Sequence, residues 1–227
     1  WDTQNSDNEP DATTLGMYDL VIWATGHEWG GAAGPGADGE SALADWLEAG
    51  GTLLLSSQDY LYDHGLTSFG VNYLGVTDYE SDKGQSVVAG VSPPFDVVSS
   101  TTLNYPFSDY SDVLELTSAA SVAFNGDNGI AGSLIDQGTW RTAFLSFPIE
   151  AMAEPGDRRE LLQAAINWVP KPPACPADIT GDGVVSVEDL LVVLSNWGGS
   201  GSADINEDGT VDVMDLLGVV AAWGECD

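Results

Sequence analysis

The sequence contains very few basic residues. Only 5 of its 227 residues are Lys or Arg, against 36 Asp and Glu, so the formal net charge is −31. A surface with this charge repels phosphate, which argues against nucleic acids and anionic membranes as partners and favours metal cations. Charged residues make up only 18% of the chain and hydrophobic residues 43%, which is ordinary for a folded globular protein.

Long apolar runs, an initiator Met and a signal peptide are also lacking. No apolar run approaches the roughly 20 residues that span a bilayer, so membrane insertion is not expected. The chain opens at Trp1, and we expect a mature or trimmed product of a longer precursor. Cysteine is confined to Cys175 and Cys226, and this pair together with the scarcity of bases indicates a secreted protein.

A proline-rich stretch divides the chain. Residues 174–227 contain eleven Asp and Glu and no Lys or Arg, whereas all five basic residues lie earlier in the chain. Proline-rich segments act as semi-rigid spacers. The sequence therefore predicts an α/β domain over 1–169, a linker over 170–174 and a small module over 175–227.

The C-terminal module is an internal repeat with a period of 26 residues. Thirteen of the 22 aligned positions in 177–198 and 203–224 are identical. Each copy begins with 12 residues, 178–189 (loop 1) and 204–215 (loop 2), that carry oxygen-bearing side chains at positions 1, 3, 5, 9 and 12 and Gly at position 6. A calcium loop uses these positions, adds a backbone carbonyl from position 7, and needs the Gly for its sharp turn.

The spacing predicts two Ca²⁺ ions, one in each loop. In loop 1 the expected ligands are Asp178, Thr180, Asp182, Val184, Ser186 and Asp189. In loop 2 they are Asp204, Asn206, Asp208, Thr210, Asp212 and Asp215. Thr180 carries no charge where an acid or amide is usual, so loop 1 is expected to bind more weakly. The alternative is a pair of Asp- and Gly-rich turns without a metal.

The duplicated loop with Asp at position 12, followed by one helix, resembles the dockerin type I module and secreted planctomycete-type repeats. The resemblance implies an α-helical module with two EF-hand-like calcium loops related by a pseudo-two-fold axis. Such packing would bring Cys175 and Cys226 together as a disulfide, with two free thiols as the alternative. Cellulosomal dockerins help to recognise cohesin through loop positions 10 and 11, often a Ser-Thr pair. Val187-Glu188 and Val213-Met214 stand there instead, which argues against ordinary cohesin binding.

Residues 1–169 predict alternating strands and helices. Strands are expected at 19–25, 52–56, 121–124, 130–135 and 142–147, and helices at 39–50, 67–74 and 157–168. The first of these strands is a continuous apolar run, which is typical of a buried parallel strand. Alternating elements predict right-handed crossovers and a layered sheet.

Two segments, 18–23 and 49–60, resemble a class I glutamine amidotransferase-like domain. The resemblance implies a flavodoxin-like fold with a Cys nucleophile on a strand-to-helix elbow, but the corresponding turn at 56–59 contains no Cys. We therefore predict a non-enzyme. The first strand and helix of that family are missing before Trp1, which would leave an unpaired strand edge for a neighbouring copy to fill. A truncated chain would explain the same gap.

Other chemistry in this domain is a lesser hypothesis. A serine variant of the active site, or a non-catalytic ligand or sugar pocket, could use the polar residues expected beyond the carboxyl ends of the strands. These are Ser57, Asp59, His64 and the pair His27-Glu28. A structural role through turn chemistry is the simpler interpretation. The acidic cluster Asp78, Glu80 and Asp82 is interpreted as a solvated loop, with another calcium site as the alternative.

The sequence as a whole favours a secreted, calcium-binding, non-catalytic structural protein. Its expected partner is a second copy of itself, in a filament or cell-surface structure, or a surface or scaffold protein. The alternative is an accessory fragment of a secreted hydrolase that the dockerin-like module anchors to a scaffold.

Overall fold

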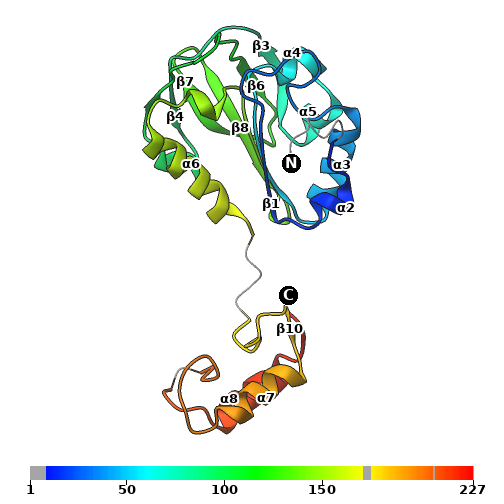
Figure 1. The fold of residues 1–227 in the computed structure, drawn as a ribbon, viewed down its shortest axis with the longest axis vertical. Coiled ribbons are helices and arrows are strands. Elements are labelled where there is room, and N and C mark those ends of the chain that lie inside the picture. Colours follow the sequence, from blue (N-terminus) through cyan, green and yellow to red (C-terminus); the bar gives the residue numbers. More distant parts are fainter. Residues whose placement is uncertain (1–8, 171–174, 207, 227) are drawn as a thin grey trace. The chain divides into compact units, whose positions relative to one another are not determined.

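The computed structural model describes residues 9–170, 175–206 and 208–226 (Figure 1). The chain divides into two compact units, Trp1–Pro170 and Lys171–Asp227. This boundary falls in the predicted linker, of which residues 171–174 lie outside the described part. In the described residues, no helix is long and apolar enough to cross a membrane.

The N-terminal unit is built on a seven-stranded mixed sheet with the strand order β1-β2-β9-β8-β7-β4-β5. Its strands are β1 (Leu20–Ala24), β2 (Thr52–Ser56), β4 (Val87–Gly90), β5 (Thr101–Thr102), β7 (Ser121–Gly126), β8 (Ile130–Asp136) and β9 (Arg141–Leu145). A separate antiparallel pair joins β3 (Val76–Glu80) to β6 (Val113–Leu116). The α-helices are α2 (Ala12–Leu15), α3 (Ala37–Glu48), α4 (Tyr60–His64), α5 (Ser68–Asn72) and α6 (Pro155–Trp168), and 3₁₀ turns occupy Phe95–Val97 and Ile149–Ala151.

Only part of the main sheet is parallel. β1 and β9 both run parallel to β2, whereas β8, β7, β4 and β5 follow one another in antiparallel pairs. The helix α3 between β1 and β2 allows a parallel crossover, but the short connection between β8 and β9 allows only an antiparallel neighbour. All five predicted strands exist, but alternation with helices holds only for β1-α3-β2. The sequence did not predict β3 to β6.

Side chains alternate between the two faces of the sheet and build a core on each. In β2, Leu54 joins the core under α6, while Leu53 and Leu55 join the core under α3 and α5. Figure 1 shows α6 on one side of the sheet and α3 and α5 on the other. Helix α3 ends before Gly50, whose φ of +114° suits glycine. The coarse prediction of an α/β domain is therefore confirmed.

The first strand is less buried than its apolar sequence predicts. β1 forms an edge of the sheet, since the described residues give it a neighbouring strand on one side only. Ile22 is 40% exposed, and Tyr18 and Met17 before the strand are also exposed. A hollow of about 590 Å³ lies along this strand, and Pro10 and Glu150 are among its other lining residues. The prediction that β1 is a parallel strand is correct. The prediction that it is fully buried is wrong, because an edge strand has a single neighbouring strand.

The C-terminal unit is two copies of one loop-and-helix unit. Its helices are α7 (Val187–Ser195) and α8 (Val213–Ala221), and its short strands are β10 (Val184–Val185) and β11 (Gly224–Glu225). The buried hydrophobic side chains form three pairs that are each 26 residues apart, and these pairs are Ala177 with Ala203, Val185 with Val211, and Val193 with Val219. The repeat in the sequence is therefore a repeat in the core.

The two copies are interleaved. Loop 1 contributes β10, which pairs with β11 after the helix of the second copy. In the equivalent place, Val211 of loop 2 exchanges two hydrogen bonds of 2.8 Å with Gly198 and Gly199, after the helix of the first copy. Each loop thus closes on the end of the other copy, and neither half contains all of its own backbone partners.

The disulfide joins Cys175 to Cys226, as predicted, with 5.9 Å between their Cα atoms. The Cys226 N–H also donates to the Gly183 carbonyl at 3.0 Å, so this crosslink is attached to loop 1 by a backbone hydrogen bond. The N-terminus and C-terminus of the module are therefore fixed together at one of the two candidate metal-binding loops.

Candidate functional sites

The first Asp of each loop organises the turn that follows it. In loop 1, the carboxylate of Asp178 accepts the N–H of Asp182 at 3.1 Å and of Gly183 at 2.8 Å. In loop 2, Asp204 accepts the equivalent N–H groups of Asp208 and Gly209 at the same two distances. Repetition of the same contacts shows that both loops have one conformation.

Glycine is needed at loop position 6. Gly183 and Gly209 have φ values of +86° and +96°, which other L-residues adopt at a cost. A Cβ atom at either position would meet nothing within 4 Å, so the requirement is for the backbone conformation and not for space. This is the turn that the calcium-loop pattern predicted.

The last Asp of each loop is buried and returns to the loop backbone. Asp189 accepts the N–H of Thr180 at 2.9 Å and of Ser186 at 2.8 Å, and both residues at position 12 are 0% exposed. Asp215 accepts the equivalent N–H groups of Asn206 and Asp212. These backbone donors hold the pKa of Asp215 below its usual range.

Positions 5 and 9 complete the repeated network. The carboxylates of Asp182 and Asp208 accept the N–H of position 7 at 2.9 Å and 3.0 Å. Ser186 and Asp212 cap the helices α7 and α8, each in a capping box with the Asp at position 12. Every side chain that the sequence proposed as a ligand therefore lies on one of two equivalent turns. Hydrogen bonds between residues of the same loop hold each turn in place.

The donor set fits a hard cation such as Ca²⁺. Loop 1 has three carboxylates at its ligand positions and loop 2 has four, and residues 174–227 contain no Lys or Arg to balance them. In loop 1 the hydroxyl of Thr180 lies 3.3 Å from Asp178 Oδ1 and 3.0 Å from Asp189 Oδ1, so positions 1, 3 and 12 meet. In the described residues, no three His, Cys, Asp or Glu side chains already surround a single point as metal ligands. The carboxylates hold loop N–H groups instead.

An exposed apolar face accompanies these loops. On α7 it consists of Val187, Leu191 and Leu194, followed by Trp197, and on α8 of Val213, Leu217 and Val220, followed by Trp223. Each residue has its counterpart 26 positions away, and α7 and α8 are in contact. Exposed apolar side chains in such number on a small unit indicate an interaction surface.

The polar residues of the N-terminal unit do not assemble into a nucleophilic site. Ser57 is buried, and its hydroxyl donates to the Ala33 carbonyl at 2.6 Å. The His64 ring packs against Tyr60 at 5.4 Å, and Asp59 accepts a hydrogen bond from the neighbouring Gln58 side chain. The serine variant therefore lacks its hydrogen-bonded relay. These contacts are those of a structural turn.

The other polar residues from the sequence have separate partners. His27 packs against Phe107 at 5.4 Å, and its Nε2 lies 4.0 Å from Glu28. Asp78 accepts its neighbouring backbone N–H, and Glu80 pairs with Lys83 at 2.7 Å. The acidic cluster is thus divided between separate partners. Asp82 lines a hollow that His27 and Asp59, two residues proposed for a ligand pocket, also line.

That hollow lies beyond the carboxyl ends of β1 and β2 and measures about 500 Å³. Its lining includes Trp29, Tyr62 and Tyr110, which the sequence analysis did not select. Open α/β sheets bind ligands at the carboxyl ends of their strands. Aromatic residues in the polar segments that follow strands were therefore the sequence signal for this hollow. The contacts that bring Tyr110 there are long-range and have no sequence signature.

Asp112 gives this region a pH-dependent stability. The side chain is 2% exposed, and burial, with Asp82 and Asp59 as nearby like charges, raises the pKa of Asp112 to about 7. In the unfolded chain this carboxyl has its ordinary pKa of 3.8, so the stability from this group is fully present below about pH 4 and is lost as the pH rises from there to about 7.

We expect Asp112→Asn to stabilise the protein above pH 7 and to leave its stability unchanged below pH 4. The Asn amide oxygen can keep the hydrogen bond from the Asp82 N–H while removing the charge. The gain is about 4 kcal/mol, because the pKa rises from 3.8 to about 7 and each unit of pKa is worth ~1.4 kcal/mol. Thermal unfolding of both proteins across this pH range measures it, with the exposed Asp96→Asn as the control. An equal gain at every pH would contradict it.

Comparisons with known proteins do not assign a family. No protein-family model and no curated protein sequence matches the chain. Among solved structures, the cytoplasmic protein STM3548 from Salmonella typhimurium is similar, with 15% identity and a TM-score of 0.48, over 71% of this chain and 76% of that one. The N-terminal domain of mmIFT52 has 13% identity and a TM-score of 0.47, over 71% and 81%.

A glycoside hydrolase is similar over a short part of its length. The β-galactosidase Gan42B of G. stearothermophilus has 15% identity and a TM-score of 0.46, and the match covers 67% of this chain but 22% of that one. Similarities at this level of identity and TM-score support no inference about activity, substrate or partners.

Proposed function

We propose that this chain is a secreted, non-catalytic structural protein whose C-terminal unit is a dockerin-like module that binds two Ca²⁺ ions. The observation that carries the proposal is the repeated geometry of the two loops. The same backbone N–H groups of positions 3, 5, 6, 7 and 9 donate to equivalent carboxylates in both copies. A turn held in this way keeps the oxygens of positions 1, 3, 5, 9 and 12 near one another.

Calcium would supply the positive charge that these loops lack. The expected side-chain ligands in loop 1 are Asp178, Thr180, Asp182, Ser186 and Asp189, with the carbonyl of Val184. In loop 2 they are Asp204, Asn206, Asp208, Asp212 and Asp215, with the carbonyl of Thr210. Two ions would offset about four units of the net charge of −31, which lowers the electrostatic cost of self-association.

The N-terminal unit would provide an assembly surface. We propose that it is an amidotransferase-like domain of flavodoxin-like origin, in which the described residues place no strand on the outer side of β1. An unpaired strand edge is a template for a strand of another chain. Exposed Ile22 and Tyr18 would be covered by that strand, so a second copy of the protein would satisfy both backbone and apolar groups. A head-to-tail contact of this kind produces filaments.

Self-association is tested by light scattering of the full chain in calcium. We expect large particles that dissociate after EGTA, and we expect Ile22→Lys to abolish them because a charge on an edge strand opposes pairing. Ile166→Lys is the matched control, since Ile166 is equally apolar and 52% exposed on α6. A monomer in calcium at high protein concentration would be evidence against assembly.

The absence of catalysis rests on the contacts of Ser57, whose hydroxyl is committed to the Ala33 carbonyl. Neither cysteine lies in this unit, because both belong to the module. Glutaminase and amidase assays of the full chain should give no turnover. An esterase activity that Ser57→Ala removes would replace this proposal with the serine variant.

The alternative function is an accessory fragment of a secreted hydrolase that the module anchors to a scaffold. The observation in its favour is the repeated apolar face of α7 and α8, which is suited to a protein partner. A calcium-loaded monomer that binds a surface or scaffold protein, and loses that binding in the double variant Leu191→Asp with Leu217→Asp, would support the alternative over self-assembly.

A further inference from the structure

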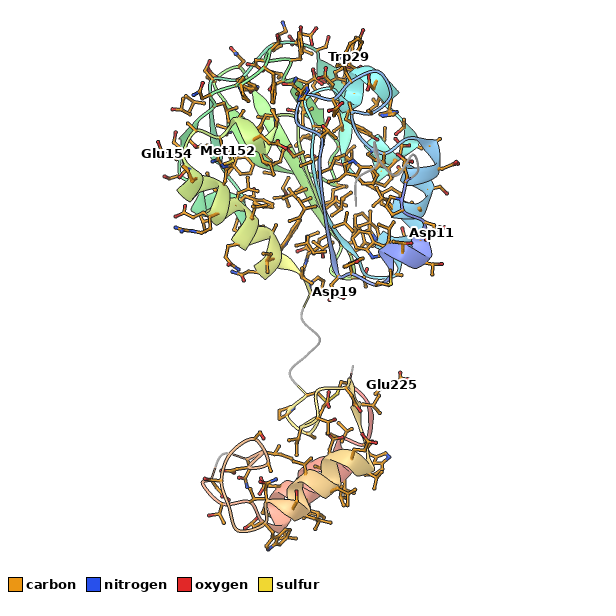
Figure 2. All side chains as sticks on the ribbon, in the orientation of Figure 1. Asp11, Asp19, Trp29, Met152, Glu154 and Glu225 are labelled. Carbon is orange, nitrogen blue, oxygen red and sulfur yellow. A yellow bond between two sulfur atoms is a disulfide. The ribbon has the colours of Figure 1, made fainter. Side chains whose placement is uncertain are left out.

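The hollow beyond β1 and β2 has an aromatic lining. Trp29, Tyr62 and Tyr110 line it and are 70%, 66% and 46% exposed, and Phe107 lies beneath the His27 ring. Figure 2 shows Trp29 at the opposite end of the domain from Asp19, where β1 begins. This end is where the carboxyl ends of the parallel strands meet and where ligands of open α/β sheets bind.

Polar contacts hold these rings at the hollow. Asp63 accepts the N–H groups of Gly30, Gly31 and Ala33 at 3.0, 2.7 and 3.2 Å, which fixes the segment after Trp29 to the helix α4. Tyr62 belongs to that helix. The carboxylate of Asp63 is thus directed into the loop backbone while the two neighbouring aromatic rings remain exposed. Rings that are positioned but left uncovered are available to a ligand.

The opposite wall is tied down in the same way. The Gln58 amide donates to Asp59 at 3.0 Å and to the Ser108 carbonyl at 3.2 Å, and its oxygen accepts the Tyr110 N–H at 3.3 Å. Gln58 is 2% exposed, so this network lies inside the protein. The segment with Tyr110 is therefore preorganised and needs no ligand to bring it into place.

The charges at the hollow are negative. Asp59 and Asp82 are among its lining residues, and none of the residues that line it is Lys or Arg. Burial, followed by the nearby charges of Asp63 and Asp82, raises the pKa of Asp59 above its ordinary value. A cation in the hollow would remove this unfavourable interaction between like charges.

We propose that this hollow binds an organic cation, an ammonium or guanidinium group on an apolar body, between the rings of Trp29 and Tyr62 and the carboxylates of Asp59 and Asp82. Aromatic faces attract such cations, and the volume of about 500 Å³ accommodates a small ligand or one long side chain. A bare Ca²⁺ ion is a poor match, because it takes about six to eight oxygens and gains nothing from the rings. A neutral sugar would contact the rings but leave the carboxylates uncompensated.

The site is independent of the calcium loops, because all of its residues belong to the N-terminal unit. The cation could be a free molecule or a Lys or Arg side chain of a partner protein. A free cation and a Lys or Arg side chain have the same chemistry at the contact. They differ in whether the peptide residues that flank the cationic side chain add affinity.

Calorimetric titration of the full chain in calcium tests the proposal with three probes. The first probe is choline, and the second is its uncharged isostere in which carbon replaces nitrogen. The third is a set of short lysine and arginine peptides, with a glycine peptide as the reference. We expect choline to bind about tenfold more tightly than the isostere, because only choline gains the ring and carboxylate attraction. A peptide that binds still more tightly and competes with choline identifies a protein side chain as the natural cation.

Variants locate the binding. We expect Trp29→Ala and Asp82→Asn each to weaken choline about tenfold. Asn tolerates the φ of +57° at position 82, so the second variant should keep the backbone intact. Trp197→Ala, which removes another exposed ring, from the C-terminal unit, is the matched control and should bind as the parent does. Circular dichroism of each variant verifies folding.

The proposal is overturned if no cationic probe binds, or if choline and its isostere bind equally. It is also overturned if Trp197→Ala loses as much affinity as Trp29→Ala. Binding of N-acetylglucosamine together with no binding of any cation would assign the hollow to carbohydrate and reject the organic cation.

Discussion

Removal of calcium should unfold the C-terminal module. Asp189 and Asp215 are buried, and residues 174–227 supply no basic side chain to balance the seven carboxylates at the ligand positions of the two loops. Without cations these carboxylates repel one another, so the free energy of calcium binding becomes free energy of folding. At a calcium concentration about a hundredfold above Kd, two sites contribute about 5 kcal/mol. Few small modules have stability in excess of that value.

Circular dichroism of residues 174–227 before and after EGTA measures this effect. We expect the helical signal of α7 and α8 to be lost on chelation and to return with added calcium. Asp215→Asn should raise the calcium concentration that is needed, while Glu225→Gln, which removes an exposed charge outside both loops, should not. Full helicity in EGTA would contradict the proposed calcium dependence.

Loss of the disulfide should cost the module about 4 kcal/mol. The bond between Cys175 and Cys226 closes a separation of 51 residues, and the chain-entropy model assigns a loop of this length about that value. In a domain of this size, the unfolding midpoint should fall by about 20 °C. The variant Cys175→Ser with Cys226→Ser, measured in calcium, tests this expectation.

The disulfide should also affect the two loops unequally. Cys226 donates its N–H to the Gly183 carbonyl, and Gly183 stands at position 6 of loop 1. Loop 2 has no equivalent crosslink in the described residues. The double Ser variant should therefore lose more calcium affinity at loop 1, which isothermal titration resolves as a split of the two binding steps. Parent protein treated with a reductant is the control and should behave identically, and an unchanged midpoint in both would contradict this account.

The interleaving of the two copies explains why calcium and the disulfide are both expected to stabilise one small core. β10 of loop 1 pairs with β11 beyond α8, and Val211 of loop 2 pairs with Gly198 and Gly199 beyond α7. Neither loop-and-helix half can satisfy its backbone alone. Binding of a metal at one loop would therefore stabilise the end of the other copy and would make folding of the module cooperative.

Local patterns in the sequence determined much of this protein. The 26-residue period predicted the repeated loops, and the buried pairs of Val185 with Val211 and Val193 with Val219 follow the same period. Proline composition located the boundary near residue 170, and apolar runs located β1 and β2. Each of these features depends on residues that are close together in the chain, or on copies of them, so they can be recognised without knowledge of the fold.

Only the tertiary structure decided which strands are neighbours and which surfaces remain open. The apolar run of β1 is the same for an edge as for a central strand, and exposure of Ile22 follows from the single neighbour that the sheet provides. The hollow likewise requires Trp29 and Tyr110, which are far apart in the chain, to be fixed by Asp63 and Gln58. Such long-range contacts depend on the whole sheet, because no local residue preference specifies them.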